Sequence, residues 1–141
     1  MAKEKVICDT DVLIDYFDQT RTRHSDTRLI LEEDIGLNNV LMSSITKMEL
    51  LLGATNKIDF GIVEKKLNRF TIIIILINGR INLKAIELIQ SYRLSHGLAL
   101  ADAMIAATAI ETKLKLFTYN IKDFKFISKL SLFKTSDTLT K

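Results

Sequence analysis

The segment TIIIILI, residues 71–77, restricts the fold of this 141-residue chain more than any other stretch of it. Every residue after the threonine is apolar and most are β-branched, which favours a strand over a helix. Apolar side chains on both faces of a strand are typical of a parallel sheet that helices cover on both sides. We therefore expect an α/β fold in which this segment is a central strand.

Three other short apolar segments alternate with helical patterns along the chain. They are KVICD, VLMSS and LKLFTYN, at residues 5–9, 40–44 and 114–120. The spacing of apolar residues predicts helices at 11–18, 25–35, 45–54, 59–70, 81–97 and 99–113. We expect Ser25 or Asp26 to open the second helix and Gly36 to end it. The prediction is a single domain, residues 1–141, with a short and mostly parallel sheet.

Composition excludes several classes of protein. The longest apolar run, residues 72–77, is far shorter than the roughly 20 residues of a membrane span. The N-terminus has no apolar stretch of signal-peptide length, so we expect a soluble, cytoplasmic protein without membrane contact. Cys8 is the only cysteine, which rules out an internal disulfide, makes a cysteine-based zinc site implausible and suits a buried position.

The net charge of +3 is unevenly distributed. Residues 111–141 contain seven lysines and three acidic residues, a local charge of +4. Such a tail suits a polyanionic partner such as nucleic acid, but it is equally typical of a solvated surface that aids solubility.

Acidic and amide side chains follow the predicted strands. They are Asp9, Asp11, Glu49, Asp102, Asn120 and Asp123. The carboxyl ends of parallel strands share one edge, so we expect Asp9, Glu49 and Asp102 to converge there, together with Asn120. Two carboxylates about 4 Å apart repel by roughly 4 kcal/mol at an effective dielectric near 20, so such a group needs a cation. Oxygen donors without His or Cys favour Mg²⁺ or Mn²⁺.

Each acid also has a structural interpretation. Asp11 would cap the helix that begins at DVLIDYF, and Asp102 would interact favourably with the N-terminus of its own helix. Apolar neighbours surround Glu49 and Asp102, which argues against ordinary surface ion pairs. We assign no catalytic role to either histidine.

Four motifs in order resemble those of the PIN-domain ribonucleases, and specifically the VapC-type toxins of bacterial toxin–antitoxin pairs. They are CDTDVLIDYF, SSITKMELLLG, LALADAMIAATAI and FTYNIKDF, and together they span nearly the whole chain. The resemblance implies a three-layer α/β/α sandwich and Mg²⁺- or Mn²⁺-dependent endonucleolytic cleavage of RNA. It also implies a homodimer and a partner antitoxin that covers a groove of the toxin.

The resemblance also assigns roles to residues. Asp9, Glu49 and Asp102 are the expected metal ligands and, with Asn120, the catalytic set. Thr118, Asp11 and Asp123 are expected to support them, and Lys122 and Lys125 to bind the RNA backbone. The apolar residues of segment 28–52 are candidates for the antitoxin groove or, alternatively, for the core: Leu29, Leu31, Leu51 and Leu52.

One departure from the family pattern keeps alternatives open. Many members carry Asp where this chain has Asn120, which would weaken a second metal site. A non-catalytic PIN-like binding module therefore remains an alternative. A haloacid-dehalogenase-type phosphohydrolase using Asp9 and Asp11 is another, although the paired acids expected near the closing strand are missing.

Overall fold

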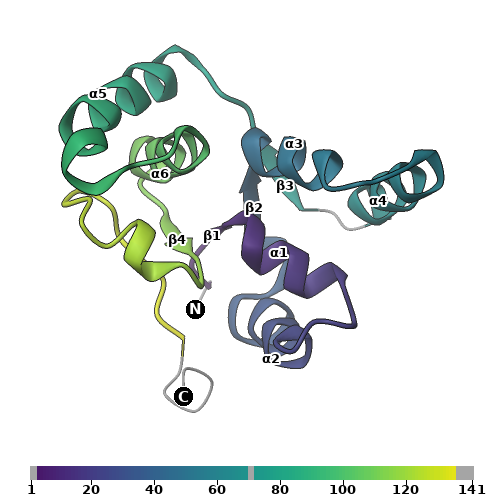
Figure 1. Cartoon of the computed structure of the whole chain (residues 1–141). Helices are drawn as coiled ribbons and strands as arrows, with labels where there is room; N and C mark the ends of the chain where they lie inside the picture. Colours follow the sequence, from purple (N-terminus) through teal and green to yellow (C-terminus); the bar gives the residue numbers. More distant parts are fainter. Residues whose placement is uncertain (1–2, 70–71, 136–141) are drawn as a thin grey trace.

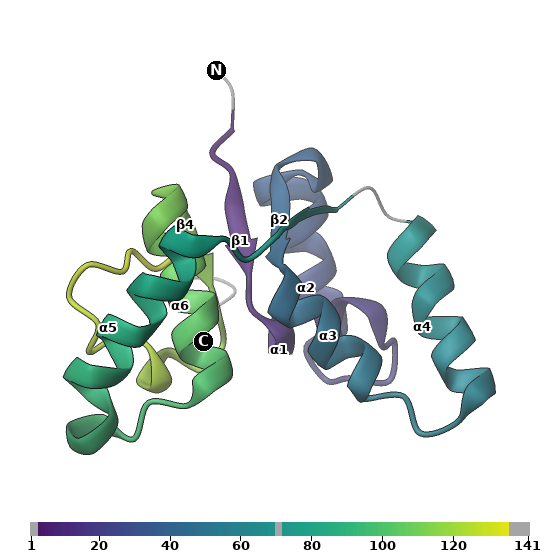
Figure 2. The same cartoon turned by 90° about the horizontal axis from the view of Figure 1, so that it is seen from above.

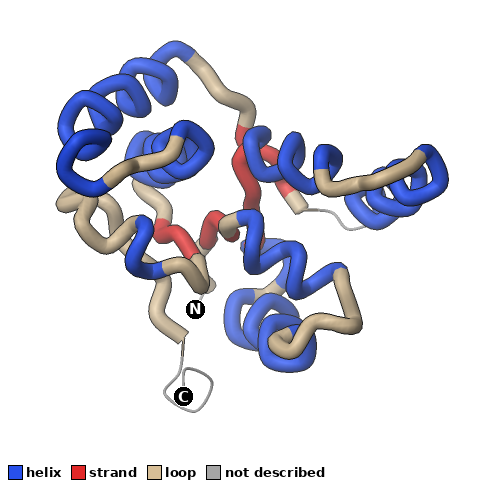
Figure 3. The backbone as a smooth tube through the Cα atoms, viewed as in Figure 1, coloured by secondary structure: helices blue, strands red, loops and turns tan. Residues whose placement is uncertain are grey.

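Four short parallel strands form the centre of the molecule. The structure is a computed structural model that describes residues 3–69 and 72–135. The strands are β1 (Val6–Cys8), β2 (Val40–Ser43), β3 (Ile73–Ile75) and β4 (Lys115–Phe117), and their order in the sheet is β3-β2-β1-β4. All three neighbouring pairs are parallel, as the sequence predicted. Figure 3 shows how small this sheet is beside the helices around it.

Helices connect and cover the strands (Figure 1). The α-helices are α1 (Thr10–Phe17), α2 (His24–Leu29), α3 (Ser44–Leu52), α4 (Lys57–Arg69), α5 (Gly79–His96) and α6 (Leu100–Thr112). Three shorter segments complete the described elements: the π-helical η1 (Ile30–Ile35) and the 3₁₀ turns η2 (Leu37–Asn39) and η3 (Ile121–Asp123). The predicted helix end at Phe70 and the predicted strand start at Thr71 lie outside the described residues.

Alternate side chains of the strands enter two separate apolar cores. On one side, Ile7, Leu41 and Leu116 pack with α5 and α6 residues such as Ala85 and Ile105. On the other side, a second cluster joins strand residues to α1 and η1: Val6, Cys8, Val40, Met42 and Phe117 pack with Val12, Leu13, Ile30, Leu31 and Ile35. This is the two-residue period of strands that are buried on both faces. The result is the predicted α/β/α arrangement, seen from above in Figure 2.

The prediction that residues 71–77 form a central strand was wrong. Within the described sheet, β3 is the edge strand and pairs with β2 alone, whereas β1 and β2 lie in the middle. Ile73 is 49% exposed there. A run of apolar residues predicts a strand but contains no information about its order in the sheet, because a partly covered edge tolerates the same side chains.

Two predicted helix starts also differ from the structure. Asp9, not Asp11, is the N-cap of α1, and its side chain accepts a hydrogen bond from the Thr10 backbone N–H. The second helix begins at His24 with no side-chain cap and continues into the π-helical η1. It ends as expected at Gly36, whose φ of 86° lies in the region that glycine adopts most readily.

No helix in the two described ranges is both long and apolar enough to span a membrane.

Candidate functional site

The first and last strands bring two distant motifs together at the carboxyl edge of the sheet. Cys8 pairs with Phe117, so Asp9 and Thr118 leave their strands side by side. The Asp9 backbone N–H donates to the Phe117 carbonyl at 2.9 Å, and the Thr118 hydroxyl donates to Asp9 Oδ2 at 2.8 Å. Both residues are buried. The structure thus places the first acid and the predicted supporting threonine in direct contact.

Burial gives Asp9 an unusual protonation equilibrium. The residue is 5% exposed, and this burial raises the pKa of Asp9 above its ordinary value. The hydrogen bonds from Thr118 and the Thr10 N–H oppose this rise. A positive charge beside Asp9 would favour its ionised form in the same way.

Asp11 also belongs to this edge. Its carboxylate accepts hydrogen bonds from the backbone N–H groups of Val12, at 2.7 Å, and Tyr119, at 3.1 Å. Burial, followed by the negative charge of Asp9, raises the pKa of Asp11 to about 7. Asp11 therefore ties the start of α1 to the segment after β4, rather than capping the helix as the structural interpretation proposed.

Glu49 reaches the site through a residue that the sequence analysis did not single out. The Thr10 hydroxyl donates to Glu49 Oε1 at 2.5 Å, and it lies 3.1 Å from the Thr46 hydroxyl. Thr10 stands between the two acids of the first motif, so its hydrogen bond to Glu49 joins α1 to α3 beside those acids. The only sequence signal was its position inside the triplet DTD.

Asp102 lies in the first turn of α6 and is partly buried. Burial, followed by the charges of Asp9, Asp123 and Glu49, raises the pKa of Asp102 to about 6. Each of these carboxylates is thus near enough to Asp102 to repel its charge. The four acids, which come from four different parts of the sequence, occupy one edge of the sheet.

The remaining predicted residues lie on the exposed side of this edge. Asn120 is exposed, and its backbone N–H donates to the Thr118 hydroxyl at 3.0 Å. Asp123 lies in η3, and its charge raises the pKa of Asp102. Lys122 and Lys125 are exposed as well, and RNA binding by either of them stays a prediction.

The donor chemistry of the site fits a hard divalent cation. The converging groups are carboxylates, and a cation would offset the repulsion that raises the pKa of Asp102. Among residues 3–69 and 72–135, however, no three His, Cys, Asp or Glu side chains are already arranged around one ion position. The hydroxyls of Thr118 and Thr10 hold Asp9 and Glu49 in their present positions.

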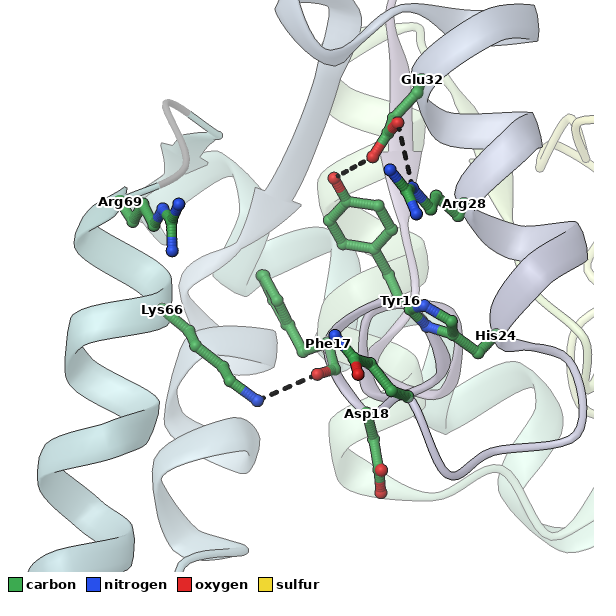
Figure 4. Close-up of a pocket in the computed structure, with 9 residues that line it drawn as sticks. Tyr16, Phe17, Asp18, His24, Arg28, Glu32, Lys66 and Arg69 are labelled. Atoms are coloured by element: carbon green, nitrogen blue, oxygen red, sulfur yellow. Dashed lines mark hydrogen bonds and ion pairs between the residues drawn. The ribbon is translucent and has the colours of Figure 1, made fainter.

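A separate cavity of about 700 Å³ lies between α1, α2 and α4 (Figure 4). Tyr16 donates to Glu32 at 2.9 Å on one wall, and Lys66 donates to the Phe17 carbonyl at 3.0 Å on the other. The full lining is Tyr16, Phe17, Asp18, Gln19, His24, Arg28, Glu32, Lys66 and Arg69. A second hollow, of about 400 Å³, shares Phe17, Asp18 and Lys66 with the first and extends to Glu49.

The leucines that were candidates for a groove divide into two groups. Leu31 is fully buried in the core beside α1, so its groove role was wrong. Leu29 is 52% exposed and Leu52 is 83% exposed, whereas Leu51 is partly buried. The two exposed leucines are free to contact a partner.

Comparisons with known proteins agree with this geometry. The family model described as "PIN domain" matches residues 6–130. A toxin–antitoxin complex from Klebsiella pneumoniae contains a chain with 31% identity and a TM-score of 0.68, over 89% of this chain and 95% of that one. In the structure of FitAcB from Neisseria gonorrhoeae, a chain has 25% identity and a TM-score of 0.73, over 92% and 96%. No curated protein matched the sequence.

A further neighbour, VapBC2 from Rickettsia felis bound to a DNA fragment from its promoter, shares the fold at 23% identity and a TM-score of 0.72, over 93% of this chain and 98% of its own. The match to the PIN-domain model removes the reason to consider a haloacid-dehalogenase-type phosphohydrolase. PIN domains are in general nucleases. With its parallel sheet, its acids at the carboxyl edge and its match over residues 6–130, the chain belongs to the PIN-domain family.

Proposed function

We propose that this protein is a divalent-metal-dependent endoribonuclease and the toxin of a toxin–antitoxin pair. The observation that carries the proposal is the convergence of three acids at the carboxyl edge of a PIN-domain sheet, where burial and then the charges of Asp9 and Glu49 raise the pKa of Asp102. Carboxylates brought together from separate motifs destabilise the fold unless they bind a cation. RNA cleavage of this kind would take place in the cytoplasm.

The residues of the site would have different roles. Asp9, Glu49 and Asp102 would hold Mg²⁺ or Mn²⁺, which when bound lowers the pKa of a water and offsets charge on phosphate oxygens. Thr118 and Thr10 orient Asp9 and Glu49 through the hydrogen bonds described above. The neutral amide of Asn120 adds a polar group without adding to the repulsion, which suits a single ion.

RNA binding would use the exposed lysines beside the site. Lys122 and Lys125 lie two and five residues after Asn120 in the sequence, on either side of Asp123, so phosphates held by them would lie close to the acids. Phosphate contacts position a strand without reading its bases. We therefore expect mutation of either lysine to weaken RNA binding and to reduce its dependence on salt.

Metal titration tests the proposal directly. Mn²⁺ should raise the melting temperature of the wild type, by a free energy approaching 2.7 kcal/mol at about 100 times the dissociation constant. Asp9→Asn and Asp102→Asn should abolish both this shift and RNA cleavage, whereas Asp34→Asn, at an exposed acid in η1, should change neither. RNA cleavage by the wild type that is equally fast in EDTA would overturn the proposed mechanism.

Two observations favour a second candidate, a PIN-like module that binds without catalysis. No three acids are preformed around one ion position in the described ranges, and Asn120 replaces an acid. This candidate predicts RNA binding without cleavage at any Mn²⁺ concentration. The same titration therefore separates the two candidates.

The antitoxin would occupy the two neighbouring hollows beside α1. The cavity between α1, α2 and α4 shares Phe17, Asp18 and Lys66 with the second hollow, whose lining includes Glu49. A partner segment in both would extend toward the acids and exclude RNA from them. Lys66→Glu should then weaken antitoxin binding and leave the RNA cleavage rate of the isolated toxin unchanged.

A homodimer would use the outer face of α5. Ile81, Ala85 and Leu88 of this helix are buried against the core, whereas Leu83, Ile86 and Leu94 are 70%, 52% and 102% exposed. The exposed three recur at helical spacing along one side. Replacing Leu94 by Glu should convert a dimer to a monomer in light scattering, and unchanged mass would exclude this surface.

A further inference from the structure

The side chain of Arg23 contacts two other side chains, those of Asp15 and Tyr119. Arg23 precedes α2, and its Nε lies 2.9 Å from Oδ2 of Asp15, an α1 residue whose side chain is 6% exposed. The same guanidinium lies over the ring of Tyr119, with Cζ 4.0 Å from the ring centroid. An arginine whose planar group is both ion-paired and stacked is far more restricted than a surface arginine.

Tyr119 is held from several further directions. Its hydroxyl lies 2.6 Å from Oγ1 of Thr27, which is fully buried in α2, and its ring packs edge-on against Phe117 with centroids 5.2 Å apart. Its backbone N–H donates to Asp11. In the sequence it stands between Thr118, which donates to Asp9, and Asn120. The position of this ring therefore fixes the strand-end segment that meets both acids.

We propose that Arg23 is a positioning residue for the acidic site, because its guanidinium clamps the Tyr119 ring and thereby holds segment 118–120 against Asp9 and Asp11. The inference rests on the proposed function of that site. It adds a residue from the polar connection between α1 and α2, a part of the chain that no motif of the site includes. Asp15 keeps the guanidinium over the ring, since its buried carboxylate needs a positive partner.

A purely structural ion pair is the alternative, and Arg21 provides the matched control. Arg21 lies in the same connection and pairs with Asp18 at 3.5 Å, with both side chains about half exposed, at 53% and 44%. The exposure of the Arg23 side chain is almost the same, 51%. Removing either arginine therefore removes one positive charge from the exposed segment between α1 and α2. Of the two, it is Arg23 that contacts Tyr119.

The first test compares kinetic constants for RNA cleavage with Mn²⁺. Arg23→Ala should lower kcat about 10-fold and leave KM for RNA within twofold, because the altered groups are those that orient the acids. Arg21→Ala should leave both constants at the wild-type level. Arg23→Lys keeps a charge for Asp15 without the planar group, so its kcat should fall between those of the wild type and the alanine variant.

Arg23→Ala also leaves the buried Asp15 carboxylate without its partner, so a second pair of variants separates folding from positioning. The double variant Arg23→Ala, Asp15→Asn removes the charge together with its partner and should recover the melting temperature but not kcat. Tyr119→Leu keeps apolar volume without an aromatic face and should reproduce the loss of kcat in a chain whose Arg23–Asp15 pair is intact.

A third readout does not depend on cleavage. In ¹⁵N-edited NMR spectra, Arg23→Ala should move the amide signals of Tyr119 and Asn120, and the Mn²⁺ concentration for half-maximal thermal stabilisation should rise several-fold. Unchanged amide signals and Mn²⁺ affinity would overturn the inference, as would a loss confined to KM, which would make Arg23 an RNA contact. If the wild type bound Mn²⁺ but cleaved no RNA, the proposed function would fail. The spectra would still test whether Arg23 positions Tyr119 and the residues beside it.

Discussion

The hydroxyl of Thr118 donates a hydrogen bond to the carboxylate of Asp9 across a separation of 109 residues, at 2.8 Å in a buried environment. The parallel pairing of β1 with β4 produces this contact, since Cys8 and Phe117 are register partners one residue before each group. This hydrogen bond favours the ionised form of Asp9, whereas burial of Asp9 disfavours that form. It therefore links the topology of the sheet to the charge of the site.

Thr118→Val should remove this link with little change in volume. The loss of a buried hydrogen bond to a charged group costs about 1.5–3 kcal/mol of unfolding free energy, and the pKa of Asp9 should rise further. Mn²⁺ affinity should fall about 10-fold. Urea unfolding with and without Mn²⁺ measures both effects, and Thr118→Ser, which keeps the hydroxyl, should restore most of the affinity.

Thr10→Val should detach Glu49 from α1. Its hydroxyl donates to Glu49 at 2.5 Å, so the variant should weaken Mn²⁺ binding by about 10-fold through loss of orientation. Calorimetric titration with Mn²⁺ gives the affinity. The matched control is Thr22→Val, at an exposed threonine outside the site. Equal affinities for wild type and Thr10→Val would show that Glu49 does not need this hydroxyl.

Stability without metal should fall as the pH rises from about 4 to about 7. Asp11 and Asp102 have pKa values of about 7 and about 6 in the folded protein, raised mainly by burial, against about 3.9 in an unfolded chain. In this window the folded state binds more protons than the unfolded state, so the unfolding free energy decreases with pH. Both side chains keep some solvent contact, which limits the loss to about 1–2 kcal/mol.

Thermal unfolding across this pH range measures the effect. Asp102→Asn should flatten the curve in part, because one titrating group is removed. Mn²⁺ should stabilise the wild type more at pH 7.5 than at pH 5, since protons compete for the same oxygens. A wild-type melting temperature that rises steadily between pH 4 and pH 7 would contradict the assigned pKa directions.

Leu31→Ala should destabilise the core beside α1. Leu31 is fully buried, so truncation should lower the unfolding free energy by about 2–5 kcal/mol. Leu52→Ala, at a leucine that is 83% exposed, should change it by less than about 0.5 kcal/mol. Urea denaturation of the two variants provides the comparison, and similar values would mean that Leu52 is covered in solution.

The sequence predicted the strand ends well because apolar runs and the acids that follow them are local features. Asp9 and Thr118 follow directly from β1 and β4, and parallel pairing of those strands places them together. The order of the strands could not be predicted in this way, since β3 has the side chains of a central strand and lies at the edge.

Residues whose role depends on another element escaped prediction. Thr10 matters because Glu49 of α3 lies against its hydroxyl, and Arg23 because Tyr119 lies beneath its guanidinium. No periodicity or spacing near either residue contains that information. Such contacts exist only in the folded chain, which is why the sequence patterns identified the acids and Thr118 but not Thr10 or Arg23.

Asp9 begins α1 with one carboxylate oxygen, which accepts from the Thr10 N–H, while its other oxygen accepts from Thr118. A substitution at Asp9 that is meant to abolish the proposed nuclease activity therefore also loosens a helix terminus. Inactive forms for structural work are better made at Asp102. This residue is not the N-cap of its helix, because Ala99 occupies that position in α6. The choice of residue decides whether an inert protein still has the shape that its partner recognises.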